Sequence, residues 1–71
     1  MQRYLILIEP TTTGYSAYSP DIAGCVATAS SREAIEEVMR DAVGFHLEGL
    51  RASGQPVPSP NTCASYVEVP V

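Results

Sequence analysis

The stretch Gly14–Glu33, GYSAYSPDIAGCVATASSRE, contains the change from strand to helix that decides the fold. Its segments Tyr15–Ser19 and Cys25–Ala29 have strand-like composition and are separated by a turn that contains proline and glycine. Ser30 is followed three residues later by Glu33, the spacing of a capping box at a helix start. The stretch therefore predicts two adjacent strands that lead directly into a helix.

The helix is expected to run from about Ser31 to Ala52, where apolar residues recur at helical spacing. Gly54 is placed to end the helix, and Pro56 does not allow it to continue. The connector Gln55–Pro60 is expected to cross the surface in an extended form, because its prolines remove amide donors.

Two further strands are expected outside this stretch, Arg3–Glu9 and Ala64–Val69. Short connections make the first three strands an antiparallel meander, and the helix then makes the fourth strand parallel to the first. The first strand is apolar on both faces, which favours the order 3-2-1-4; a fourth strand beside the third is the alternative. The expected fold class is α+β, a single domain over residues 1–71, similar to part of a ribonuclease H-like two-layer sandwich.

The chain has more apolar surface than one helix and one sheet face can bury. In the first strand, Leu5 and Leu7 face away from the side that holds Tyr4, Ile6 and Ile8. The apolar arc of the helix spans about 220°, wider than the stripe of about 100° that a surface helix needs. Its unmatched edge consists of Val43, Leu47 and Leu50. We expect these residues to form the interface of a homo-oligomer, with a dimer favoured; cover by the connector and the C-terminal tail is the alternative.

The charge composition argues against several classes of partner. The net charge is −4, lysine is absent, and the cations are Arg3, Arg32, Arg40 and Arg51. Nucleic-acid binding depends on cations placed against phosphates, so direct binding to DNA or RNA is not expected. No apolar run approaches the roughly 20 residues of a membrane span, and no export signal precedes the first strand. A cytoplasmic protein with reduced thiols is therefore expected.

No catalytic, cofactor-binding or metal-binding residue is predicted. His46 has no carboxylate one turn away on its face, which favours a core or interface histidine over a general base. Cys25 has no clear cationic neighbour, which favours a small buried side chain over a nucleophile. The cysteines and the histidine are too far apart in sequence to suggest a zinc site. Ribonuclease H-like enzymes resemble one another in an aspartate within the first strand, whereas here the first acid is Glu9 at its end.

Three segments carry recognisable motifs. Gly14–Thr28 resembles the signature GYSAYxPDLPGCxAT, and Ser31–Glu37 resembles the helix start TxEEAxxN. His46–Arg51, with the glycine and prolines that follow, resembles the ending HLEGLxxxGxPxPxP. In order and spacing these are the motifs of HicB-like antitoxins, which the chain resembles over nearly its whole length. The resemblance implies an antitoxin of a toxin–antitoxin pair, whose HicA toxin is a small basic protein that cleaves RNA with a histidine.

This resemblance and the acidic composition predict a protein that binds and neutralises a HicA-type RNase by protein–protein contact. The expected contact residues are Tyr18, Pro20, Asp21, Ile22, Glu33 and Glu37. Turn formation alone is the alternative for Pro20 and Asp21, and a solvated helix face is the alternative for the two glutamates.

Two other functions stay open at this point. One is an orphan homo-oligomeric scaffold or small-ligand-binding protein without a toxin partner. The other is a degenerate nuclease with residual magnesium-dependent activity. The sequence ends at Val71 without a second helix, so no operator-binding domain is expected.

Overall fold

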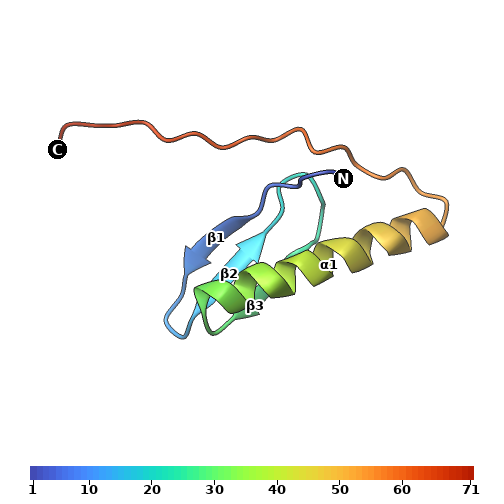
Figure 1. Ribbon diagram of the computed structural model, residues 1–71, viewed down its shortest axis with the longest axis horizontal. Coiled ribbons are helices and arrows are strands. Elements are labelled where there is room, and N and C mark those ends of the chain that lie inside the picture. Colours follow the sequence, from blue (N-terminus) through green and yellow to red (C-terminus); the bar gives the residue numbers. More distant parts are fainter.

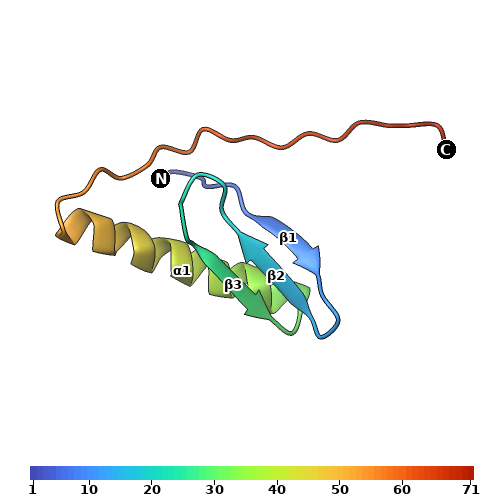
Figure 2. The same ribbon diagram turned by 180° about the vertical axis from the view of Figure 1, so that it is seen from behind.

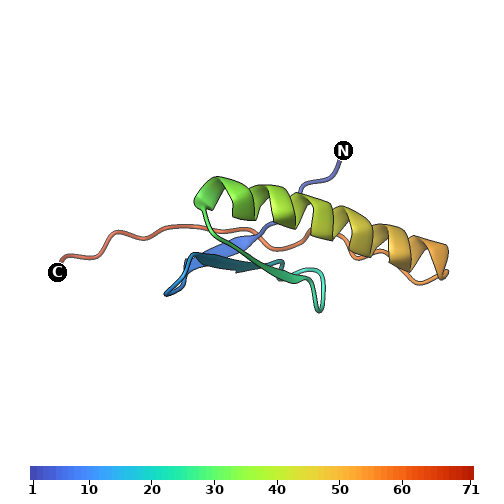
Figure 3. The same cartoon turned by 90° about the horizontal axis from the view of Figure 1, so that it is seen from below.

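The computed structural model describes residues 1–71, which form one antiparallel sheet, one helix and a long C-terminal tail. The elements, in chain order, are β1 (Leu7–Pro10), β2 (Tyr15–Tyr18), β3 (Val26–Ala29) and α1 (Arg32–Ala52). The strands pair in the order β1-β2-β3, and α1 lies across one face of the sheet as a second layer (Figure 3). The predicted meander and long helix are therefore confirmed.

The pairing register places two rows of side chains on opposite faces of the sheet. The inner row, which faces α1, consists of Ile8, Ala17 and Ala27. The outer row, on the face that α1 does not cover, consists of Leu7, Tyr18 and Val26. Each row joins one residue of every strand, because successive strand residues point to alternate faces.

The core lies between the inner row and α1. Its buried residues are Ala17, Ile22, Cys25, Ile35 and Met39. Ile35 and Met39 lie one turn apart on α1 and have no exposed surface. Partly buried side chains complete this cluster, among them Tyr4, Ile6 and Ile8 from the N-terminal part of the chain. As predicted, Leu5 and Leu7 are not part of the cluster.

The unmatched edge of α1 differs from the prediction. Val43 and Leu47, two of the three residues that we expected to lack a partner, pack against the core cluster, whereas Leu50 is half-buried outside it. The opposite edge is exposed instead, with Val38 at 40% and Phe45 at 80% exposure. The sequence defined the apolar arc correctly, but the packing of α1 against the sheet decides which edge of that arc is covered. This helix is not apolar enough to cross a membrane.

Both ends of α1 are capped by hydrogen bonds. The N-cap is Ser31, one residue later than the capping box predicted, because its side-chain oxygen accepts the amide of Ala34 at 3.1 Å. At the C-terminal end, Gly54 has a φ of 74°, and its amide donates to Arg51. The amide of Gln55 donates to Leu50, which completes a Schellman motif.

The predicted fourth strand does not form. Ala64–Val69 has no strand assignment, and no backbone–backbone hydrogen bond links residues 63–71 to the rest of the chain. The tail runs back along the molecule past the N-terminal segment and then diverges from β1 (Figures 1 and 2). The radius of gyration is 13.9 Å, against about 11 Å for a compact chain of this length. A strand needs a backbone partner, and in this arrangement the tail has none.

Gly14 is required by a close approach that the sequence does not reveal. A Cβ at this position would lie 2.3 Å from the carbonyl oxygen of Ala29 and 2.9 Å from the Cα of Ser30, both backbone atoms. We expect Gly14→Ala to lower the free energy of unfolding by about 1–3 kcal/mol, as overpacking does. Gly44→Ala is the matched control, because a Cβ there meets no atom within 4 Å and a helix favours alanine by roughly 1 kcal/mol. Urea unfolding of both variants tests this, and equal stabilities would contradict it.

Candidate partner-binding surface

The loop between β2 and β3 is held against the core by hydrogen bonds and by a buried side chain. The amide of Ile22 donates to the carbonyl of Ser19 at 3.2 Å, and the amide of Cys25 donates to that of Ile22 at 3.3 Å. Gly24 has a φ of 76°, a left-handed conformation that glycine adopts without strain. The hydroxyl of the buried Ser19 donates to the carbonyl of Leu5 at 2.9 Å, which ties the loop to the N-terminal segment. These contacts give the loop a defined surface.

The position of Ile22 corrects one predicted contact residue. Its side chain is 1% exposed and belongs to the core, so it anchors the loop and offers no surface to a partner. The turn sequence that surrounds it suggested exposure, but a buried apolar residue at the centre of the loop is what holds the turn in place.

Asp21 serves a structural purpose that the sequence analysis missed. Its carboxylate accepts the amides of Asn61 and Thr62 at 3.1 and 3.0 Å, and the Thr62 hydroxyl at 2.7 Å. These three bonds form a clasp, the Asp21 clasp, between the β2–β3 loop and the start of the tail. The hydrogen bonds, chiefly that from the Thr62 hydroxyl, hold the pKa of Asp21 below its ordinary value. This residue is therefore engaged with the tail of its own chain.

The Asp21 clasp should open in acid. A lowered pKa in the folded state means that the stabilising effect is present above the ordinary carboxyl pKa of about 3.9 and is lost as the pH falls through the lower, folded-state pKa. We expect the amide resonances of Asn61 and Thr62 to shift cooperatively in an NMR titration, with a midpoint below about 3.9. Asp21→Ala should show open-clasp shifts at every pH, and Asp41→Ala should titrate as the wild type does. A titration at or above the ordinary value would contradict the clasp.

The outer row forms an uncovered apolar surface. Tyr18 is 41% exposed and Val26 is 69% exposed, and the pairing register places them side by side with Leu7. Exposed Pro20 follows Tyr18 at the end of β2. Val26 was missed by the sequence analysis. Because neighbouring strand residues face opposite sides, the buried Cys25 indicates that Val26 faces outward. Only the pairing of Val26 with Tyr18 places Val26 in the outer row.

The two predicted glutamates lie elsewhere. Glu33 and Glu37 are exposed on α1, in the layer on the opposite side of the sheet from Tyr18. A single flat surface does not contain both these glutamates and the outer row. Of the six predicted contact residues, Tyr18, Pro20 and the buried Ile22 line one pocket together with Val26. Asp21 bonds to the tail instead.

The side chains that could act as a nucleophile, a general base or a metal ligand were located in the structure. Cys25 is 3% exposed, as expected for a small buried side chain, and burial raises the pKa of its thiol. His46 is half-buried on α1. No three His, Cys, Asp or Glu side chains come close enough together to hold a metal ion.

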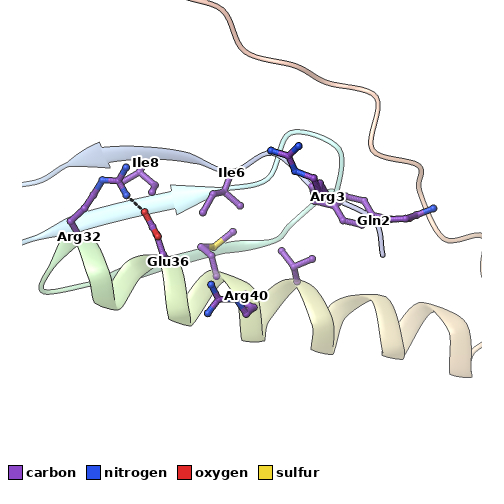
Figure 4. A pocket seen from close by; sticks show the side chains of 10 residues that line it. Gln2, Arg3, Ile6, Ile8, Arg32, Glu36 and Arg40 are labelled. Carbon is purple, nitrogen blue, oxygen red and sulfur yellow. Dashed lines mark hydrogen bonds and ion pairs between the residues drawn. The ribbon is translucent and has the colours of Figure 1, made fainter.

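A second surface feature lies beside β1. An open groove of about 610 Å³ runs between the N-terminal segment with β1 and the side of α1 (Figure 4). Its apolar lining consists of Tyr4, Ile6, Ile8, Met39 and Val43. Three of the four arginines of the chain surround it, Arg3, Arg32 and Arg40. Arg32 pairs with Glu36, which also lines the groove.

Comparison with known proteins identifies the class to which this fold and surface belong. The family model for the HicB_like antitoxin of bacterial toxin-antitoxin systems matches residues 4–71. The chain belongs to this family.

Two individual proteins are similar to the chain. One, an uncharacterized 14.9 kDa protein from the rep-hol intergenic region of Haemophilus phage HP1 (strain HP1c1), is 31% identical over 70 residues. That match covers 94% of this chain and 50% of the phage protein, so the chain spans about half the length of this relative. The other is a chain of the solved HicA3 and HicB3 toxin-antitoxin complex, with a TM-score of 0.74 and 35% identity. It covers 84% of this chain and 70% of its own length.

Proposed function

We propose that this protein is an antitoxin that binds a HicA-type RNase through the outer row and neutralises it. The observation that carries the proposal is an apolar row on a sheet face that no other part of the chain covers, in a member of the HicB-like antitoxin family. Exposed apolar patches of this kind mark protein–protein contact sites. The similarity to a chain of the HicA3 and HicB3 complex supports a HicA-type partner.

The charge of the chain supports the same partner. With a net charge of −4, the protein attracts a basic RNA-binding surface and competes with RNA for it. Electrostatic attraction raises the rate of association with the toxin, while burial of the outer row slows dissociation of the complex. The proposed inhibition therefore works by occupying the toxin, without any bond being made or broken by the antitoxin. Because the substrate of such a toxin is cellular RNA, neutralisation in the cytoplasm is part of the proposal.

Binding to a HicA-type toxin tests the proposal. The full chain is titrated into that toxin, and complex formation is followed by calorimetry while RNA cleavage is measured in the same buffer. We expect loss of cleavage to follow complex formation at the same stoichiometry. A toxin that keeps full activity when saturated with the chain, or that does not bind it, would overturn the proposal.

We also propose that the protein self-associates as a dimer. Leu7 lies on the outer face of the sheet, and three large apolar residues of the tail are exposed: Tyr66, Val67 and Val69. A domain of 71 residues draws little stability from its own core, so burial against a second copy is a substantial gain.

A further inference from the structure

We infer that the tail of one copy adds a fourth strand to β1 of a second copy, and that the second copy does the same in return. The inference rests on the proposed self-association and says how it occurs. The donor is Ala64–Val69, and the acceptor is the free edge of β1 together with the adjoining groove. The toxin-binding proposal does not depend on it.

The tail has the features of a strand without a partner. Tyr66 is 99% exposed, Val67 83% and Val69 65%, and no backbone–backbone hydrogen bond satisfies this segment. Its sequence, ASYVEV, has the aromatic and β-branched composition of a strand. An unpaired segment of this kind is a ready partner for a sheet edge.

The acceptor is open in the same molecule. β1 is an edge strand, since it pairs only with β2. The groove lies beside it, and Figure 4 shows Ile6 and Ile8 along one side, with Arg40 on the α1 side and Arg3 toward the N-terminus. A strand paired with the free edge of β1 would place every second side chain over this groove.

The side chains of the tail alternate in a way that matches the two faces that a strand beside β1 would have, one toward α1 and one on the outer side. Tyr66 and Glu68 share one face, and Val67 and Val69 share the other. With Tyr66 and Glu68 toward the helix, the tyrosine ring covers the apolar lining and the carboxylate meets the arginines around the groove. The two valines then lie on the outer side, next to the partly buried Leu5 and Leu7.

A second copy fits this arrangement better than the tail's own sheet. The Asp21 clasp fixes Asn61 and Thr62 at the β2–β3 loop. Residues 62–64 line a pocket with the chain's own N-terminal segment, and only beyond them does the tail diverge from its own β1 (Figures 1 and 2). The elongated shape, 49 Å along its longest axis, reflects this divergence. Two copies related by a twofold axis can exchange tails reciprocally, which closes the assembly and leaves neither tail unpaired.

Charge reversal tests the exchange between chains. Light scattering of the full wild-type chain should give twice the chain mass of 7.6 kDa. Glu68→Arg, and separately the double variant Arg3→Glu/Arg40→Glu, should each weaken the dimer by at least about 10-fold, because each places like charges together. An equimolar mixture of the two variants should restore the dimer, since each tail then meets an oppositely charged groove. Glu48→Arg, an exposed reversal outside the groove, is the matched control and should leave the dimer unchanged.

Isotope-filtered NMR on a mixture of labelled and unlabelled chains distinguishes a failure of tail exchange from a failure of self-association. Contacts between Val67 or Tyr66 of one copy and Ile6 or Ile8 of the other are expected. A monomeric wild-type chain would overturn both self-association and tail exchange. A dimer whose intermolecular contacts avoid the tail, or one that persists in both charge variants, would overturn the exchange and leave self-association intact. A mixture that stays monomeric would overturn the exchange as well.

Discussion

Replacing Ile35 with alanine is expected to remove most of the stability of this protein. Ile35 has no exposed surface and packs at the centre of the cluster that joins α1 to the sheet. Truncating a fully buried isoleucine costs about 2–5 kcal/mol, which is close to the roughly 3–5 kcal/mol that a core of this size supplies. Urea unfolding followed by circular dichroism at 222 nm should show a transition shifted to far lower urea, or no folded baseline.

Val38→Ala provides the matched comparison for this result. Val38 lies on the same helix but is 40% exposed, on the edge of α1 that the sheet does not cover. Its truncation should lower the free energy of unfolding by no more than about 0.5–1 kcal/mol. Similar losses for the two variants would mean that α1 packs against the sheet with a different face from the one described here.

Replacing Tyr18 with alanine is expected to weaken toxin binding by about 30-fold or more. Tyr18 lies at the centre of the outer row, between Leu7 and Val26, where an aromatic side chain has the most contact area to lose. Anchors of this type contribute about 2 kcal/mol or more on truncation, which corresponds to the stated change in Kd. Calorimetric titration of the toxin with the variant measures the change.

Phe45→Ala is the control for that measurement. Phe45 is an aromatic residue at 80% exposure, but it lies on α1 and not on the outer face of the sheet. Its loss should leave toxin affinity within about twofold of the wild type. If Phe45→Ala weakens binding and Tyr18→Ala does not, the toxin binds the helix layer and the outer row is not the contact site. Circular dichroism spectra of both variants should match that of the wild type, which checks that neither change disrupts the fold.

The candidate site was only partly predictable. Tyr18 and Pro20 were predicted to contact a partner; both are exposed, and the contact itself stays a prediction. Ile22 was misplaced because a single sequence does not show which apolar residue of a turn points inward. Asp21 was seen as a turn or contact residue, whereas its hydrogen-bond partners lie 40 and 41 residues away in the chain.

The sequence by itself determined the order of the first three strands and the helix, the C-terminal end of α1 and the width of its apolar arc. These features depend on hydrogen bonds and side-chain periodicity within a few residues, so they can be read locally. The outer row, the exposed edge of α1 and the unpaired tail were decided only by the tertiary structure. Each depends on register or contact between segments far apart in the chain, such as the pairing of Tyr18 with both Leu7 and Val26.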